Sequence, residues 1–376
     1  MKINPFCSFI ISTLFMMLAS CLSASEILSG TEHSLYAKIM KKTPAPSDTA
    51  DKAVKKANEK EPPETDEKKS QWIEETLDYG IQDERIKAIN KITQIKNEDV
   101  KRKLARRLIG LMKEEYDPDV LVKAVTALSE MKEKDSIPLL TEKIDNPVEE
   151  VRIAAVYGLK RLGAVQAKDK MIRKLKEQDL EKKSNFTEAL LSALAEFKAG
   201  EIFPFVKDAL AGDKTDRKVK EDMILFLGKA RAKEATDILL KLYADEEEEA
   251  TLRAYAVNSL ANIGIVEAAP EIKRVIKSIE SYEFKKKQKY HTLYLYSITA
   301  LAKLGDADAV PKLIQALRSN NPEIRVKVIG LIKEFKDQRT IDILKYKMKN
   351  DQEPKVRAAA KKALEELGVE VKDEKK

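Results

Sequence analysis

Apolar residues recur at helical spacing along most of the chain. Residues 151–163 show the pattern: with Val151 counted as position 0, apolar side chains occupy positions 4, 5, 8 and 11. These positions share one face of an α-helix. The same face begins again at intervals of 31 to 41 residues, which indicates an internal repeat. The nine start positions are Glu84, Val120, Val151, Phe186, Val219, Leu252, Leu293, Ile324 and Val356.

Positions 8 and 11 are apolar in all nine helices. At position 8 the residues are Ile92, Leu128, Leu159, Leu194, Leu227, Leu260, Leu301, Ile332 and Leu364. At position 11 they are Ile95, Met131, Leu162, Phe197, Ala230, Ile263, Leu304, Phe335 and Leu367. Each interval has the length of one helical hairpin, roughly 30 to 50 residues. The pattern predicts an all-α protein, an α-solenoid of about nine helical hairpins with terminal caps over residues 70–376. We call the recurrent helix of each hairpin its inner helix and the other its outer helix.

The outer helices and the turns carry start signals of their own. Proline is tolerated in the first turn of a helix, where the backbone N–H has no intrahelical partner. Four predicted outer helices begin in this way, with Pro138, Pro204, Pro270 and Pro311. Asp or Asn precedes proline in three turns that lead into inner helices, which predicts N-caps at Asp117, Asn146 and Asn321.

The repeated segments resemble HEAT repeats, and more closely the short HEAT-like repeats first described in phycobilisome lyases. The resemblance is carried by residues 151–163, 252–264 and 356–368, and the repeats cover about 300 residues. It implies an α-solenoid. It does not imply one function, because folds of this kind serve many unrelated activities.

Three departures from the repeat predict local features. The longest interval, between Leu252 and Leu293, predicts an insertion near residues 278–290. Lys361 replaces an apolar residue at position 5 of the last helix, as expected for a terminal cap with a polar outer face. Trp72 precedes the first inner helix and is expected to close the other end of the core.

Residues 1–25 have the composition of a targeting segment. Lys2 precedes an apolar stretch from Phe6 to Leu18, which is shorter than the roughly 20 residues of a membrane-spanning helix. The residues that end at Cys21 resemble a bacterial lipobox, which implies a lipidated Cys21. Cleavage after Ala24 or Ser25 is the alternative, and an uncleaved membrane anchor is a third.

The positions of the cysteines and the composition of residues 26–69 agree with an exported protein, since the only cysteine outside the apolar stretch is Cys21. The chain has two cysteines, Cys7 and Cys21, so residues 70–376 have no disulfide and no cysteine-based metal site. Residues 26–69 are rich in Lys, Glu and Pro and predict a disordered linker. We therefore expect an exported protein of the cell envelope, either periplasmic or a membrane-anchored lipoprotein.

The solvent-facing ridge of the inner helices is the candidate partner-binding surface, because solenoids generally bind along their concave side. With the core face centred on positions 4, 8 and 11, the ridge comprises positions 3, 6 and 10. Its residues are of types that binding surfaces favour. The candidates are Tyr157, Arg161, Tyr255, Asn258, Asn262, Tyr296, Thr299 and Lys303. The alternative is that Tyr255 and Tyr296 simply cover neighbouring helices.

Arginine recurs at position 1, as Arg85, Arg152, Arg253, Arg325 and Arg357. These residues predict either an anion-binding ladder or braces between hairpins. The resemblance implies braces to Asp or Asn in the preceding turn, and planar bidentate geometry suits arginine for that role. The candidate acceptors are Asp117, Asn146, Asp245, Asn321 and Asp351.

Residues 281–291 mix aromatic residues with a run of lysines. Such a segment contacts acidic lipid headgroups, an anionic polymer or nucleic acid, or is a solvated helix end. The net charge is only +7 although 35% of residues are charged, so acidic stretches offset the basic ones. Together with predicted export, this argues against a nucleic-acid partner.

Catalytic motifs are absent from the sequence. The two histidines, His33 and His291, form no metal-ligand pair, and no phosphate-binding loop, nucleophile elbow or dinucleotide motif occurs. We expect no enzyme activity, no cofactor and no metal.

These features predict a non-catalytic protein-binding scaffold or adaptor of the bacterial cell envelope. The alternative is a structural envelope protein that assembles with itself or binds a cell-surface polymer. A remote alternative is an enzyme of the chromophore-lyase or another HEAT-like type. The partner and the oligomeric state stay open.

Overall fold

The computed structural model describes residues 65–333 and 338–371. Within these residues there are nineteen α-helices, α3 to α21, and five short 3-10 helices, and there is no strand. The all-α prediction is confirmed. The predicted signal segment 1–25 with Cys21, the predicted linker up to residue 64, and Phe335 lie outside the described residues. None of the described helices is long and apolar enough to cross a membrane.

The helices alternate as predicted. The inner helices are α4 (Gln82–Ile92), α6 (Pro118–Glu130), α8 (Glu149–Arg161), α10 (Asn185–Glu196), α12 (Arg217–Ala230), α14 (Ala250–Ile263), α17 (His291–Lys303), α19 (Pro322–Ile332) and α21 (Pro354–Glu366). The outer helices are α3 (Asp66–Tyr79), α5 (Glu98–Glu114), α7 (Ile137–Lys143), α9 (Lys168–Lys176), α11 (Phe203–Ala211), α13 (Thr236–Ala244), α15 (Ala269–Ser281), α18 (Ala309–Ala316) and α20 (Gln338–Asn350). The predicted insertion forms one extra helix, α16 (Phe284–Lys289).

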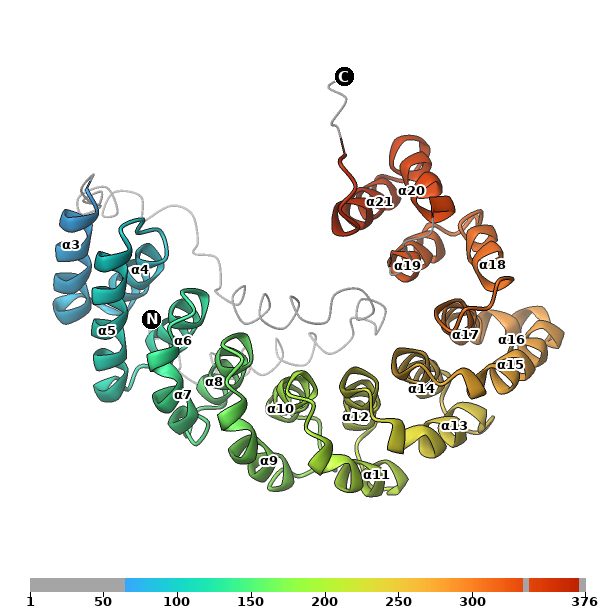
Figure 1. Cartoon of the computed structure of the whole chain (residues 1–376), viewed down its shortest axis with the longest axis horizontal. Coiled ribbons are helices and arrows are strands. Elements are labelled where there is room, and N and C mark those ends of the chain that lie inside the picture. Colours follow the sequence, from blue (N-terminus) through green and yellow to red (C-terminus); the bar gives the residue numbers. More distant parts are fainter. Residues whose placement is uncertain (1–64, 334–337, 372–376) are drawn as a thin grey trace, which may run out of the picture. The chain divides into compact units, whose positions relative to one another are not determined.

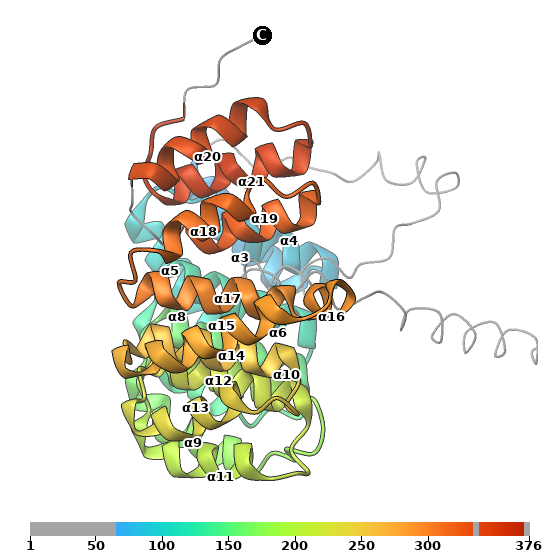
Figure 2. The same ribbon diagram turned by 90° about the vertical axis from the view of Figure 1, so that its right-hand side faces the viewer.

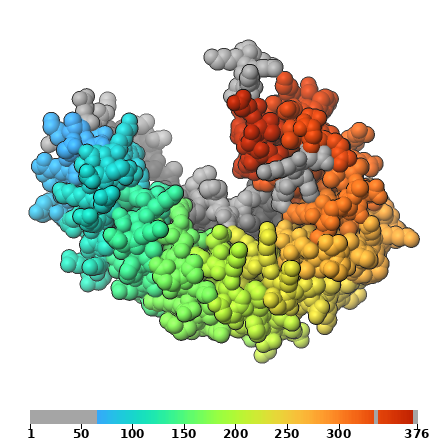
Figure 3. Space-filling model, in the orientation of Figure 1, coloured from blue at the N-terminus to red at the C-terminus, as the bar shows by residue number. Residues whose placement is uncertain are grey.

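The described residues form two compact units, 65–313 and 314–371. In the first unit the inner helices stack side by side from α4 to α14 and then α17, and outer helices pack on them (Figure 1). The inner helices lie on the hollowed side of this unit, and side chains fill the spaces between neighbouring helices (Figure 3). In the second unit α21 packs against both α19 and α20.

Position 8 forms the core, as the periodicity predicts. All nine residues at position 8, Leu260 among them, are buried, with exposed fractions of 5% or less. Burial at position 11 is less uniform. Met131, Leu162, Phe197, Leu304 and Leu367 are only half-buried. Each of these five residues is the C-cap of its helix, where the chain turns away from the core.

The helical region begins four residues before the predicted boundary at residue 70. The Thr65 side chain accepts a hydrogen bond from the Lys68 backbone N–H and so caps α3. Within α3 the buried residues include Ile73 and Leu77, whereas Trp72 is only half-buried. Trp72 is thus partly covered beside these two aliphatic residues, and its role in closing this end of the core stays a prediction.

A close backbone approach fixes α12 against α14. A Cβ atom on Gly228 of α12 would lie 2.5 Å from the Ser259 Oγ and 2.8 Å from the Ser259 Cα. The Ser259 hydroxyl donates to the Ile224 backbone carbonyl at 2.8 Å. Only glycine permits this distance, so the two helices that carry much of the candidate site are held in one register.

Candidate partner-binding surface

Six of the eight predicted partner-binding residues lie together on two neighbouring inner helices, α14 and α17. They are Tyr255, Asn258 and Asn262 of α14, and Tyr296, Thr299 and Lys303 of α17. Contacts between side chains join the two helices, and two of them pair equivalent positions, Tyr255 with Tyr296 and Asn262 with Lys303. The structure therefore makes one patch from residues that are about 40 positions apart in the chain.

Three of the six are buried, although they were predicted to form a solvent-facing ridge. The exposed fractions are 5% for Tyr255, 6% for Tyr296 and 1% for Thr299. The tyrosine rings meet edge to face with centroids 6.5 Å apart, and the Thr299 hydroxyl donates to the Leu295 carbonyl at 2.8 Å. The predicted exposure was wrong. For Tyr255 and Tyr296 the alternative is confirmed, since each ring covers the neighbouring helix, and a prediction made one helix at a time cannot show this. Their role in binding a partner stays a prediction.

Position 10 remains accessible. Asn262 is exposed and Lys303 is half-buried. The Lys303 ammonium donates to the side-chain oxygens of Asn258 at 3.2 Å and of Asn262 at 2.9 Å. This polar bridge joins α14 to α17 beside the tyrosine pair. Each Asn amide also carries an NH2 donor, so the bridge can form hydrogen bonds with a molecule that binds over it.

Tyr157 and Arg161 lie apart from this patch. Both are on α8, and α10 and α12 stand between α8 and α14 in the stack. The Arg161 guanidinium is exposed and its Nη1 lies 3.3 Å from the Glu130 Oε1 of α6. Tyr157 is half-buried, with the Lys160 Nζ 6.0 Å from its ring centroid. These two residues belong to a different part of the inner surface.

A charged cluster on α12, which the sequence analysis missed, adjoins the patch on α14. The Lys218 Nζ lies 3.0 Å from the Asp222 Oδ1 and 3.5 Å from the Glu221 Oε2. The Arg217 Nη2 lies 3.1 Å from the Glu221 Oε1. Glu221 is buried and Asp222 is nearly so. Two titratable carboxyl groups therefore occupy a largely desolvated place on an inner helix.

Burial controls the titration of this cluster. Desolvation raises the pKa of Asp222 from 3.8 to about 7, and nearby Glu188 and Glu221 add to the increase while Lys218 opposes it. Burial by itself lowers the pKa of Lys218, but the carboxylates of Asp222 and Glu221 outweigh it and the pKa is raised. Burial, with the same two carboxylates, raises the pKa of Tyr255. The surroundings of Asp222 thus disfavour its ionised form despite the nearby ammonium group.

Position 3 of the inner helices shows a change that could have revealed this cluster. Ala154 and Ala189 occupy the position in α8 and α10, and both are buried. In the next three inner helices the residues are Asp222, Tyr255 and Tyr296. Alanine is compatible with the stack, so the larger residues are not required by the fold in general. Lysine occupies the position in α4, α6 and α19, so carboxylate and phenol are confined to α12, α14 and α17. The sequence signal is this switch from alanine to carboxylate and phenol between consecutive repeats.

Comparison with known proteins identifies the repeat. The sequence profile described as HEAT repeats matches residues 72–160, 105–191 and 292–365, which together exceed half of the chain. The chain belongs to the HEAT-repeat family. No curated protein sequence matches it.

The chain is also similar to solved structures, at low sequence identity. The complex of CpcE and CpcF of phycocyanin lyase from Nostoc is 18% identical, with 77% of this chain and 99% of that chain covered and a TM-score of 0.40. The karyopherin Kap121p, bound to the extreme C-terminus of the phosphatase Cdc14p, is 12% identical, with 91% and 41% covered and a TM-score of 0.44. Human deoxyhypusine hydroxylase is 17% identical, with 81% and 97% covered and a TM-score of 0.29.

The position-1 arginines form braces in the HEAT-repeat hairpins, as predicted. Three of the five bond to a candidate acceptor residue, Arg152 to the backbone of Asn146, and Arg325 and Arg357 to Asp351. For Arg85 and Arg253 the predicted acceptors were wrong. Arg152 donates to the backbone carbonyls of Asn146 and Pro147, each at 2.9 Å, and Arg253 to that of Tyr243 at 2.9 Å. Arg85 forms an ion pair with Glu115. Asp117 and Asn321 instead cap the helices that follow them.

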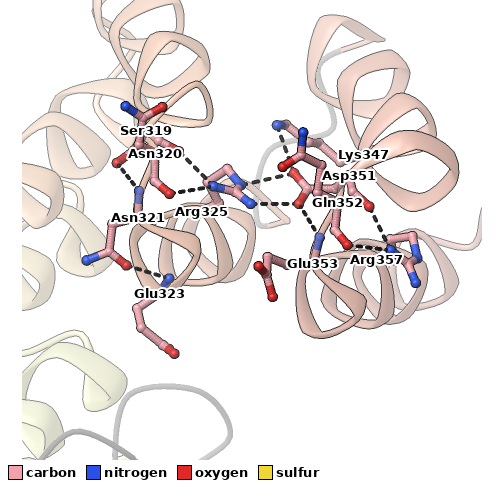
Figure 4. A network of polar contacts seen from close by, with 10 residues as sticks. All are labelled: Ser319, Asn320, Asn321, Glu323, Arg325, Lys347, Asp351, Gln352, Glu353 and Arg357. Atoms are coloured by element: carbon pink, nitrogen blue, oxygen red, sulfur yellow. Dashed lines mark hydrogen bonds and ion pairs between the residues drawn. The ribbon is translucent and has the colours of Figure 1, made fainter.

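The brace between α19 and the turn before α21 is the most extensive (Figure 4). The Arg325 guanidinium binds both carboxylate oxygens of Asp351, at 2.7 and 3.0 Å, and donates to the Ser319 carbonyl at 2.8 Å. Lys347 donates to the same carboxylate at 3.0 Å. Burial opposes ionisation, but the hydrogen bonds from Arg325 and Lys347 prevail and lower the pKa of Asp351 to about 2. Arg357 donates to the Asp351 backbone carbonyl at 2.8 Å.

The described residues hold no group of three His, Cys, Asp or Glu side chains arranged to bind a metal ion. His291 lies at the start of α17, where its ring stacks on that of Tyr294 with centroids 6.3 Å apart. The predictions of no cofactor and no enzymatic activity stay predictions. The chemistry that the α12–α14–α17 surface offers is charge and hydrogen bonding.

Proposed function

We propose that this HEAT-repeat protein is a non-catalytic scaffold that binds a protein partner along the inner helices of residues 65–313. The binding surface is centred on α12, α14 and α17, at the Asp222 carboxylate and the Lys303–Asn262 bridge. The observation that best supports the proposal is the switch at position 3 from Ala154 and Ala189 to Asp222 and the two tyrosines that follow it.

The energetics of Asp222 give the switch a physical meaning. A raised pKa means that the folded protein is destabilised when this carboxylate ionises. Alanine at the same position would avoid that cost, as Ala154 and Ala189 do. A partner that brings a Lys or Arg side chain to the cluster adds a positive charge to that of Lys218 and offsets the repulsion from Glu188 and Glu221. Binding would then lower the pKa of Asp222 and recover the lost free energy, so the preferred partner presents a basic residue.

A site-specific photo-crosslinker tests where the partner binds. The crosslinking residue replaces Asn262, exposed on inner helix α14, or Asp237, exposed on outer helix α13. We expect one discrete crosslinked protein from position 262 in the source cells, and much less of it from position 237. Adding Asp222→Ala, which the fold accepts at equivalent positions, should weaken the crosslink at 262. Equal capture from both positions, or no effect of Asp222→Ala, would exclude this surface.

We place the scaffold in the bacterial cell envelope, with Cys21 as the lipidated residue. The support is the order of the N-terminal segment: Lys2, an apolar stretch from Phe6 to Leu18, and a cysteine three residues later. Cys21→Ser tests the tether. Wild type should partition into detergent and the variant should not. If both stay in the aqueous phase, cleavage after Ala24 or Ser25 replaces lipidation in the proposal.

Self-assembly is the competing outcome. Sedimentation equilibrium of the purified protein over a wide concentration range separates the two. A monomer at all concentrations agrees with a scaffold for a different protein. Association that Asp222→Ala weakens would instead assign the same surface to contacts between copies of this chain.

A further inference from the structure

The insertion between α15 and α17 builds a basic and aromatic projection that the proposed scaffold surface does not use. Phe284 begins α16, and its side chain is 74% exposed. Lys285, Lys286, Lys287 and Lys289 follow and are exposed as well. In Figure 2, α16 lies at the edge of the helices of residues 65–313. The projection is therefore open to a large, flat partner.

Aromatic contacts fix the base of this projection. Tyr282 and Tyr290 flank α16, and their rings meet edge to face with centroids 5.4 Å apart. The Lys286 ammonium lies 3.9 Å from the Tyr282 ring centroid, a cation–π contact. The Ser278 hydroxyl donates to the Tyr282 hydroxyl at 3.3 Å. Two aromatic residues thus close the loop, while Phe284 remains exposed.

The local charge is strongly positive. Between residues 277 and 289 there are five lysines and two glutamates. Of the two glutamates, Glu280 accepts hydrogen bonds from Tyr294 and Lys312 and is therefore engaged elsewhere. Glu283 remains next to four exposed lysines. The projection therefore combines a patch of net positive charge with an exposed aromatic ring.

We propose that residues 284–289 form a contact with the surface of an anionic phospholipid bilayer. Lysines near such a surface are attracted by its negative potential, each contributing roughly fivefold in affinity. A phenylalanine side chain gains by entering the boundary between headgroups and acyl chains. A soluble polyanion would neutralise the lysines but would leave Phe284 in water. A bilayer surface satisfies both features, so it is the partner that the projection fits best.

This inference does not depend on the proposed scaffold function, because α16 and the α12 cluster share no residue. It is also independent of lipidation at Cys21. If both hold, the bilayer contact orients the protein on its membrane.

Vesicle flotation tests the proposal. The probe is the full chain carrying Cys21→Ser, mixed with phosphatidylcholine vesicles that contain about 30% phosphatidylglycerol or none, at about 0.1 M salt. We expect binding to the anionic vesicles only. Lys285→Gln with Lys287→Gln should weaken it by roughly 25-fold, since two of the lysines are removed. The matched control is Lys233→Gln with Lys241→Gln, exposed lysines that precede or lie on outer helix α13, and it should bind like the parent.

Phe284→Ser distinguishes a bilayer from a soluble polyanion, because it leaves the charge unchanged. We expect it to weaken vesicle binding several-fold and to leave binding to heparin or single-stranded DNA unaltered. Circular dichroism establishes that each variant is folded. Unchanged vesicle binding by Phe284→Ser, or equal loss in the outer-helix control, would overturn the proposal. Tight binding of heparin or DNA, together with no binding to anionic vesicles, would assign the projection to a polyanion instead.

Discussion

Replacing Asp222 by asparagine should change the pH dependence of stability in a defined window. The folded-state pKa of Asp222 is about 7, against 3.8 without the fold. Between these values the unfolded chain has released the proton and the folded chain still holds it. Stability is therefore lost as pH rises from about 4 to about 7. At 1.36 kcal/mol per pKa unit, the loss caused by this one group is about 4 kcal/mol.

Asparagine is close in shape to the protonated carboxyl group and does not titrate. Relative to wild type, Asp222→Asn should therefore gain about 3 to 4 kcal/mol of unfolding free energy between pH 4 and pH 8. Urea unfolding followed by far-UV circular dichroism at several pH values measures this difference. Comparing the variant with wild type at each pH cancels the contribution of the other carboxylates to the unfolding free energy. Hydrogen exchange of α12 peptides localises the effect.

Asp237→Asn is the matched control, since its carboxylate is exposed on outer helix α13. It removes one carboxylate and leaves the α12 cluster intact. The difference in unfolding free energy between Asp222→Asn and wild type is the test. If it changes by less than about 1 kcal/mol from pH 4 to pH 8, Asp222 is less desolvated than the packing of α12 indicates. The argument that a basic partner residue is favoured at Asp222 would then be wrong as well.

Three further substitutions test the packing. Leu260→Asp puts an unpaired charge at a fully buried position, so the thermal unfolding curve should shift to lower temperature, and an unchanged curve would contradict the assigned register. Gly228→Ala should cost about 1 to 3 kcal/mol in urea unfolding because its methyl group meets backbone of the facing helix, whereas Gly158→Ala meets side-chain methyl groups and should cost less; equal costs would refute the close approach. Asp351→Asn leaves the buried Arg325 without its carboxylate and should cost about 3 to 5 kcal/mol, with faster hydrogen exchange in α19 to α21. In wild type this pairing is fully present above pH 3.8 and is lost as pH falls towards 2, so a variant equally stable at pH 6 would show that the pair contributes nothing.

Position 8 shows what helical periodicity can predict. Its nine residues were found from spacing alone, and all nine are buried. Spacing works here because a helix needs one continuous apolar face whatever lies next to it. Two of the three predicted caps were found for a similar local reason: Asp117 and Asn321 cap the helices they precede, using backbone N–H groups two or three residues away. The predicted cap at Asn146 was wrong, because Val148 is the N-cap of α8, and its backbone N–H bonds to the Asn146 side chain.

Positions 3 and 6 show where that reasoning ends. Tyr255, Tyr296 and Thr299 face away from the core of their own hairpins, so periodicity assigned them to solvent. Tyr255 and Tyr296 are buried against each other on neighbouring helices, and a single helix period carries no information about that contact. The Asp222 cluster was missed for the same reason, because its desolvation is a property of the packed helices.

The sequence by itself determined the repeat, the register of its inner helices and the sites of its turns, because each depends on residues a few positions apart. Only the tertiary structure decided which polar residues lose their water and which partners they find. Arg325 illustrates the difference: its place at position 1 was plain from the chain, but its carboxylate is Asp351 of the following hairpin, 26 residues away. Pairings of that kind are set by the distance between helices, which local sequence does not specify.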